Sequence, residues 1–249
     1  MSEPRGSALD ATGTPSETAA LLTGGVAEVG DFARLDVGRR RRTGVPEVVY
    51  ADGKTPQQTL QLLAELRVRT PESPALATRC PDEVLRQAPD AFAGEPVRVD
   101  SSARTVTVGE LPAQRGTVAV LTAGTSDLPV AREAVATLDA LGTGSRLYAD
   151  VGVAGLSRLL SVLGDVRAAD CAIVVAGMDG ALPSVVTGLL TAPVVGVPTS
   201  VGYGFADAGR AAAGAMLASC APGLTVVNID NGFGAAVHAA KIVGVRAGD

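Results

Sequence analysis

The second half of the chain alternates short, almost wholly apolar runs with longer stretches rich in alanine and leucine. Strands that are apolar on both faces are typical of parallel sheets covered by helices on both sides. The apolar runs predict strands at 118–122, 145–149, 172–176, 194–197 and 225–229. The stretches between and after them predict helices at 128–141, 155–163, 181–190, 208–219 and 233–243. This half therefore predicts an α/β fold with a flavodoxin-like, doubly wound parallel sheet.

The first half is less regular and predicts a small N-terminal α+β domain. A strand-like run at 47–51 is followed by a turn signal at Asp52-Gly53. Thr55 and Gln58 then predict a capping box at the start of a helix, with a proline between them in the first turn. An apolar stripe on this helix is predicted at Leu60, Leu63 and Leu66.

Changes in pattern divide the chain into three parts. The first residues are polar and contain several glycines and prolines, and a short helix is predicted over 16–30. Residues 75–110 mix short strands with a helix that begins at 81–83, and the regular pattern begins after a boundary near 112–116. The predicted organisation is a disordered segment at 1–15, a small domain at 16–112 and an α/β domain at 113–249.

Polar and glycine-rich segments follow all five predicted strands of the second half. The carboxyl ends of parallel strands meet at one edge of the sheet, where ligands bind in doubly wound folds. Hydroxyl and backbone N–H groups at a helix start attract anions, although each loop alone is explained equally well by an ordinary helix cap. Together the loops predict a functional cleft with the binding residues Gly124, Thr125, Ser126, Asp127, Asp150, Thr199, Ser200, Gly202, Tyr203, Asn228, Asp230, Asn231, Gly232 and Phe233.

Two nucleotide-binding motifs are excluded by their spacing. The run at 53–55 resembles the end of a P-loop, but Val48 stands where the earlier glycine is required. Gly232 and Gly234 follow a strand, yet Val237 replaces the third glycine of a Rossmann fingerprint. Any dinucleotide site in this chain is therefore of another kind.

Composition and charge exclude several classes of function. The net charge of −5 and the lack of aromatic residues within the run Arg39–Arg42 argue against nucleic-acid binding. No stretch has the length and apolarity of a transmembrane helix. The three cysteines are an odd number without a C-x-x-C pair, which favours the reducing cytoplasm and argues against a zinc site. His238 is the only histidine, so mechanisms that need a pair of histidines are excluded.

Cys220 has two interpretations when its local context alone is considered. It stands at the close of a predicted helix and before the fifth predicted strand. Most free cysteines are small buried hydrophobes, and a helix C-terminus disfavours a thiolate. Local context therefore favours an inert thiol over a catalytic one.

Long motifs of this sequence resemble the LarB family, whose C-terminal domain is related to PurE. In the first half, the similar residues are Asp36, Arg39, Arg42 and Gly44, then 46–50 and 53–55. In the second half, the similar segments are 122–131, 150–156, 181–186, 197–204, 219–223 and 227–236. The resemblance extends over residues 30–240.

The resemblance implies the first step in the synthesis of a nickel-pincer nucleotide, the cofactor of lactate racemase. The pyridinium ring of nicotinic acid adenine dinucleotide would be carboxylated with carbon dioxide or bicarbonate. Hydrolysis of the phosphoanhydride would then release AMP and a pyridinium-3,5-dicarboxylate mononucleotide. The resemblance also implies a magnesium requirement, no organic cofactor, and a homo-oligomer, an octamer.

The resemblance assigns roles to individual residues. Cys220 would add to the ring as a nucleophile, and Asp179 would remove the ring proton. Arg39, Arg42 and Lys54 become candidate substrate-binding residues of the small domain. The family has glutamate at the position of Asp179 and histidine at the position of Ser157, so this chain departs from it at both. The resemblance leaves the metal ligands and the groups that cleave the phosphoanhydride open.

Two other functions remain as alternatives. One is a PurE-type aminoimidazole ribonucleotide carboxylase or mutase, but those enzymes resemble one another in using an active-site histidine. The other is a non-catalytic dinucleotide-binding relative, which the changes at Ser157 and Asp179 favour and the presence of Cys220 disfavours.

Overall fold

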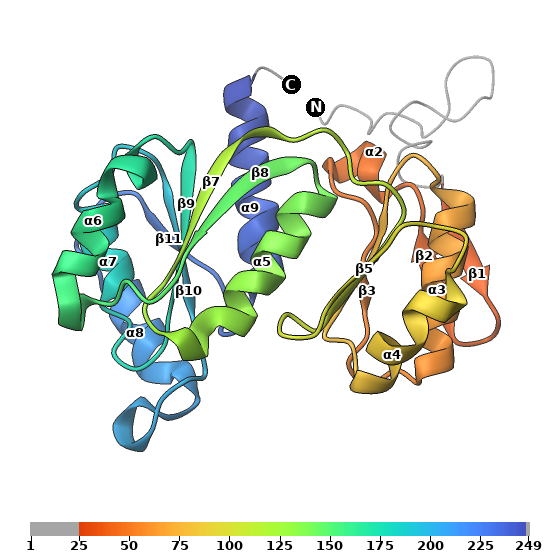
Figure 1. The fold of residues 1–249 in the computed structure, drawn as a ribbon, viewed down its shortest axis with the longest axis horizontal. Helices are drawn as coiled ribbons and strands as arrows, with labels where there is room; N and C mark the ends of the chain where they lie inside the picture. The colour runs from red at the N-terminus through yellow and green to blue at the C-terminus, as the bar shows by residue number, and fades with distance from the viewer. Residues whose placement is uncertain (1–24, 248–249) are drawn as a thin grey trace, which may run out of the picture.

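The computed structural model describes the backbone of residues 25–247, with side chains up to residue 244 (Figure 1). The predicted disorder at 1–15 and most of the helix predicted over 16–30 fall outside the described residues. Where that helix prediction can be tested, it is wrong, because 26–29 form a strand. None of the helices described is both long and apolar enough to cross a membrane.

The C-terminal lobe is built on a five-stranded parallel sheet with the order β8-β7-β9-β10-β11. Its strands are β7 (Arg115–Thr122), β8 (Thr143–Tyr148), β9 (Cys171–Ala176), β10 (Val194–Pro198) and β11 (Leu224–Val226). Counted along this lobe, the order is 2-1-3-4-5, the flavodoxin-like arrangement. The predicted fold class and the five strands are confirmed, although the fifth ends at Val226 and not at residue 229.

Helices cover both faces of this sheet (Figure 1). On one face lie α5 (Leu128–Ala140) and α9 (Gly232–Ala247), and on the other lie α6 (Leu156–Arg167), α7 (Leu182–Thr187) and α8 (Arg210–Leu217). Short 3-10 segments precede three of them, namely η1 (Thr125–Asp127), η2 (Val153–Gly155) and η3 (Gly204–Gly209). Along β9, Ile173 and Val175 pack under α5 and α9, while Ala172 and Val174 face the opposite core. This two-sided burial explains why the strands read as continuous apolar runs.

The N-terminal lobe holds a mixed four-stranded sheet with the order β3-β4-β6-β5. Its elements are β3 (Val49–Tyr50), α3 (Pro56–Arg69), β4 (Ala75–Thr78), α4 (Asp82–Ala91), β5 (Val97–Asp100) and β6 (Thr105–Val108). A hairpin of β1 (Val26–Val29) and β2 (Ala33–Asp36) and the short helix α2 (Arg39–Thr43) precede them.

The capping box predicted at the start of α3 is confirmed, because both of its hydrogen bonds are present. Gln58 N–H donates to Thr55 Oγ1 at 3.2 Å, and Thr55 N–H donates to Gln58 Oε1 at 3.0 Å. Leu63 and Leu66 are buried as expected. Leu60 is only partly buried and packs at the margin of the same core, because the buried face of α3 is centred on Leu62 and Leu63.

The two lobes lie side by side, with α5 of the C-terminal lobe facing the N-terminal sheet (Figure 1). We call the boundary between the two lobes the seam. Among the described residues, two ion pairs cross it. Arg132 on α5 lies 3.0 Å from Asp100 at the end of β5, and Arg79 after β4 lies 3.5 Å from Glu133 on α5. The seam therefore runs along the candidate binding edge of the sheet, since Glu133 also contacts the start of α9.

Candidate active site at the strand ends

The loops that follow β7 to β11 gather at the carboxyl edge of the C-terminal sheet, and we call their residues the strand-end cluster. Asp127 is its buried organising carboxylate, only 3% exposed. Its Oδ2 accepts a hydrogen bond from Gly124 N–H at 2.9 Å. Its Oδ1 accepts from Gly177 N–H at 3.1 Å and from Thr199 Oγ1 at 2.7 Å. Asp127 therefore fixes the loops after β7, β9 and β10 relative to one another.

Asp230 links the loops that follow the last two strands, β10 and β11, in the same way. Its N–H donates to Pro198 O at 2.8 Å, and its Oδ1 accepts from Ser200 N–H at 2.8 Å. Its backbone is left-handed, with φ of 56°, a conformation that aspartate adopts more readily than most residues. The carboxylate of Asp230 therefore joins the ends of β10 and β11 and orders both loops.

The start of α9 is capped by side chains of the protein itself. Glu133 of α5 is 5% exposed, and its Oε2 accepts from Phe233 N–H at 3.2 Å. Asn231 Oδ1 accepts from Gly234 N–H at 2.8 Å. Glycine is required at 232, because a Cβ there would lie 2.2 Å from Val130 O. Burial raises the pKa of Glu133, and the nearby Arg79 guanidinium opposes that rise.

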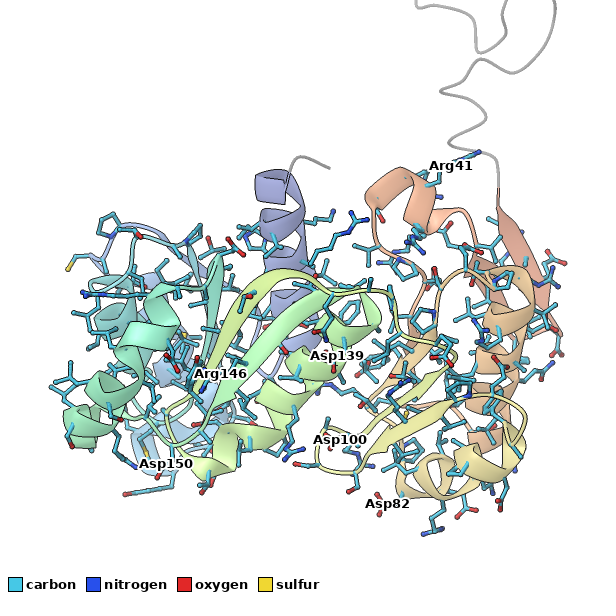
Figure 2. All side chains as sticks on the ribbon, turned by 45° about the horizontal axis from the view of Figure 1, so that its top comes forward. Arg41, Asp82, Asp100, Asp139, Arg146 and Asp150 are labelled. Atoms are coloured by element: carbon cyan, nitrogen blue, oxygen red, sulfur yellow. The ribbon has the colours of Figure 1, made fainter. Side chains whose placement is uncertain are left out.

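Asp150 follows β8, on the side of the cluster away from the N-terminal lobe (Figure 2). Its Oδ2 lies 2.5 Å from Arg158 Nη1, and its N–H donates to Thr122 Oγ1 at 3.0 Å. The carboxylate is thus paired, and Arg158 brings a guanidinium to the same edge. Ser157, where the family resemblance leads one to expect histidine, precedes it on α6 and is exposed.

Asp179 is carried on a tight turn after β9. Met178 and Gly180, on either side of it, have positive φ values of 54° and 61°. The turn packs against the segment after β10, since Met178 N–H donates to Val201 O at 2.7 Å. Gly177 is needed for this approach, because a Cβ there would lie 2.3 Å from Val201 O. The result is an exposed carboxylate beside the loop after β10.

The cluster leaves several polar side chains exposed to solvent. They carry hydroxyl, carboxylate, phenol and amide groups and belong to Thr125, Ser126, Asp179, Ser200, Tyr203 and Asn228. Hydroxyl and amide groups of this kind bind phosphate and ribose oxygens. The edge can therefore hold a phosphorylated ligand with a carboxylate close by.

Cys220 lies in the segment between α8 and β11. The segment 218–223 returns from the end of α8 to the start of β11, and Gly223 O accepts from Val194 N–H at the first residue of β10. Ser219 Oγ contacts Ser184 Oγ of α7 at 2.8 Å. Cys220 is therefore an exposed thiol on the side of the sheet where strands begin, beside α7.

The other two cysteines are buried and far less suited to chemistry. Cys171 opens the central strand β9 and is fully buried. Burial raises the pKa of the Cys80 thiol to about 12. Among the three, only Cys220 offers an accessible sulfur.

Comparison with protein families covers almost the whole described chain. Residues 26–110 match the model of the LarB/PurE-like N-terminal domain, and residues 117–249, more than half of the chain, match the model of AIR carboxylase. The chain belongs to the LarB family. It is therefore a carboxylase-type enzyme of the PurE and LarB class.

Individual proteins are also similar to this LarB-family chain. An uncharacterised protein of Methanocaldococcus jannaschii is 41% identical over 225 residues, covering 86% of this chain and 85% of its own length. The crystal structure of Treponema denticola PurE is 24% identical, with a TM-score of 0.44, and covers 53% of this chain and 82% of its own. A variant of PurE from the same organism is 23% identical with the same TM-score, covering 53% and 81%.

The two arginines of the LarB-like N-terminal signature form ion pairs within their own lobe. Arg42 makes a bidentate contact with Asp36 at 2.9 and 2.6 Å, and Arg39 lies 3.5 Å from Glu47. They sit on α2, which lies beside the starts of β7 and β8 and not beside their ends. Within one chain the structure does not bring Arg39 or Arg42 to the strand-end cluster.

Lys54 lies closer to the seam between the lobes. Its Nζ donates to Tyr50 O at 2.6 Å and stands 5.9 Å from the centre of the Tyr50 ring. The pKa of the Tyr50 phenol is raised, chiefly by its hydrogen bond to Asp52, and in smaller part by the charge of Glu133 across the seam. The end of β3 thus faces the C-terminal lobe.

A cavity of about 620 Å³ lies at the opposite edge of the sheet. Arg40, Arg115 and Lys241 line it, together with the ends of α2 and α5 and the last part of α9. Helix C-termini carry partial negative charge that cations neutralise, so the basic residues have a structural reason to be there. The cavity is therefore a weaker candidate for substrate binding than the strand-end cluster.

Among the residues that the structure describes, no three or more His, Cys, Asp or Glu side chains come together in a way that could hold a metal ion. The magnesium implied by the family resemblance thus has no cluster of protein carboxylates to bind it. Lone carboxylates such as Asp150 and Asp230 are engaged by protein donors.

Three charged residues at the carboxyl edge of the C-terminal sheet are not predicted from the sequence, namely Arg79, Glu133 and Arg158. Glu133 had a usable signal, because it stands among Ala131, Ala134 and Leu138 on the apolar face of its helix. A charged residue on a buried stripe indicates a specific partner. No comparable feature of the sequence indicates a role for Arg79 or Arg158, because only the fold brings their partners close to them.

Proposed function

We propose that this protein carboxylates the pyridinium ring of nicotinic acid adenine dinucleotide and hydrolyses its phosphoanhydride, releasing AMP and a pyridinium dicarboxylate mononucleotide. The observation that carries the proposal is the joining of a LarB-type N-terminal domain to an AIR carboxylase domain in one chain. The exposed hydroxyl and amide groups of the strand-end cluster suit a phosphorylated ligand.

In the proposed chemistry, a cysteine acts as the nucleophile that activates the ring. A pyridinium ring is electron-poor and resists carbon dioxide as an electrophile. The Cys220 thiolate adds to the neighbouring ring carbon, which converts the ring to an enamine-like dihydropyridine. The nucleophilic ring carbon attacks carbon dioxide, a base removes its proton, and expulsion of the thiolate restores the aromatic ring.

Asp179 is the proposed base. Its carboxylate is exposed on the turn after β9 and accepts only a long contact from Ala181 N–H, at 3.4 Å. It is one methylene shorter than the glutamate that the family has at this position, so we expect slower proton transfer than in a family member with glutamate. Ser157 carries no group that can replace an imidazole as a proton carrier at pH 7.

We propose that Cys220 and Asp179 act on one ring within a homo-oligomer. The thiol lies beside α7, and Asp179 lies on the turn that leads from β9 into the same helix. Exposed apolar side chains suited to an interface lie at η3, where Tyr203 is 77% and Phe205 99% exposed, and at the end of α8, where Leu217 is 74% exposed. The proposed active form is a homo-oligomer, an octamer by family resemblance. Magnesium is proposed to arrive with the phosphates of the substrate.

A mass-spectrometric assay tests this proposal. Purified protein is incubated with nicotinic acid adenine dinucleotide, magnesium and ¹³C-bicarbonate, and the expected products are AMP and a mononucleotide that has gained one labelled carboxylate. Cys220→Ala should abolish the labelled product, whereas Cys80→Ala, a change at a buried thiol, should retain it in folded protein.

Each outcome of the assay has a defined meaning. Absence of a labelled pyridinium product from the unaltered protein contradicts the proposed function. Full activity in Cys220→Ala contradicts the cysteine mechanism alone. Carboxylation of aminoimidazole ribonucleotide in a parallel reaction would favour the PurE-type alternative, against which stands the exposed position of His238 in the middle of α9.

A further inference from the structure

Among the residues that the structure describes, Arg79 is the one residue of the N-terminal lobe that makes polar contacts with two separate parts of the opposite lobe. It directly follows β4, and its Nη2 donates to Asp230 O in the loop after β11. Its Nε lies 3.5 Å from Glu133 Oε1 on α5. A single guanidinium thus bridges a cluster loop and the helix that supports it.

The backbone around Arg79 is held in an unusual conformation that aims the side chain across the seam. Its φ is 56°, a left-handed value that arginine rarely adopts, and Arg104 on the neighbouring strand end has a φ of 54°. The two strand ends are tied together through Cys80, whose N–H donates to Arg104 O at 2.8 Å. Arg104 Nε donates back to Cys80 O at 2.9 Å. Strain of this kind persists where the surroundings fix it, and often marks a functional position.

The groups that Arg79 holds are the ones that shape the end of β11. The Glu133 carboxylate receives Arg79 on Oε1 and the Phe233 N–H on Oε2. Asp230 receives Arg79 on its carbonyl and the Ser200 N–H on its side chain. The loop 228–233 is therefore held at Asp230 by Arg79 itself and at Phe233 by Glu133, the partner of Arg79.

We infer that Arg79 is a positioning residue, through which the N-terminal lobe sets the geometry of the substrate-binding loop 228–233. It acts through Asp230 and Glu133 and need not touch the substrate. The effect on catalysis rests on the proposed function, whereas the effect on the loop does not. Through this contact, the docking of the small lobe and the shape of the binding edge are coupled.

A second ion pair in the same seam distinguishes positioning from simple docking. Arg132 on α5 pairs with Asp100 at 3.0 Å, and it too joins the two lobes. Among the described residues, Arg132 makes its polar contact with Asp100 and none with the loop 228–233. A general loosening of the seam would affect the loop alike in Arg79→Gln and Arg132→Gln, whereas positioning requires the effect to be confined to Arg79 and its partner Glu133.

The decisive measurement is hydrogen exchange of the amides of Ser200 and Phe233 in the full-length protein. Arg79→Gln should accelerate exchange at both amides about tenfold or more, because each amide is bonded to a partner of Arg79. Glu133→Gln should accelerate exchange at Phe233, and the double variant should add little to the single ones. Arg132→Gln should leave both rates within about twofold of the unaltered protein.

Kinetics provide the second arm, using nicotinic acid adenine dinucleotide as substrate. Arg79→Gln should raise KM about tenfold with a smaller change in kcat, and Arg79→Lys should recover part of the loss. Unchanged exchange in a folded Arg79→Gln variant, or equal acceleration by Arg132→Gln, would overturn the inference. Inactive unaltered protein would contradict the proposed function only, because the exchange arm still decides the role of Arg79.

Discussion

At the scale of single residues, environment separates side chains that look equivalent in the sequence. The three cysteines are similarly isolated along the chain, yet Cys80 and Cys171 are buried and Cys220 is exposed. The two aspartates Asp127 and Asp179 both follow strands, but one is 3% exposed and bonded to three donors while the other faces solvent. Burial and partners decide which groups remain for chemistry.

Thiol labelling tests this separation directly. We expect one rapid reaction per chain with Ellman's reagent in native protein, and three after denaturation. Because the pKa of Cys80 is raised to about 12, its labelling should stay slow even at pH 9, where an ordinary thiol is largely ionised. Cys220→Ser should remove the rapid phase. A rapid phase that persists in this variant would contradict the burial of the other two thiols.

At the scale of elements, the sequence patterns predicted correctly the features that depend on residues close together in the chain. The capping box at Thr55 and Gln58 and the five parallel strands formed as expected. The strand at 26–29 was missed because its stability comes from pairing with 33–36, and a run of four residues carries no clear period. The fifth strand is shorter than predicted because β11 lies at the edge of the sheet, with β10 as its one neighbour.

The three loops joined by Asp127 provide a prediction at this scale. Asp127→Asn should lower the free energy of unfolding by about 2–4 kcal/mol, because an amide nitrogen then faces donors in a buried site. Ser126→Ala, a change at the exposed neighbour, should alter it by no more than about 0.5 kcal/mol. Urea unfolding of the two variants measures the difference. Equal stability in both would contradict the organising role of Asp127.

At the scale of the whole molecule, two parts of the proposed chemistry come from different segments of the chain. Cys220 is beside α7, and the strand-end cluster lies beyond the ends of the strands. The family resemblance implies that Cys220 and the strand-end cluster act in one reaction. A sequence motif does not show which copy of the chain supplies each group. The proposed homo-oligomer would bring both to one substrate, and η3 with its exposed aromatic residues projects from the lower end of the C-terminal lobe (Figure 1).

The interface prediction is tested by light scattering after size exclusion. Unaltered protein should elute as an oligomer, and Phe205→Asp should shift it toward smaller species, because a charge would enter an apolar contact. Val68→Asp changes another exposed apolar residue, 79% accessible, on α3 of the other lobe and should leave the oligomer intact. Unaltered protein that is monomeric at assay concentration would contradict the proposed arrangement.

The sequence by itself determined the fold class and the edge at which the polar loops gather. Apolar runs and helical periods are local properties, and parallel strands necessarily bring their carboxyl ends together. The tertiary structure alone decided which of those side chains remain for a ligand, because their partners are remote in the chain. Thr199 engages Asp127, and Arg79 reaches Asp230 from the other lobe. Such pairings depend on long-range geometry, which a pattern along the chain does not contain.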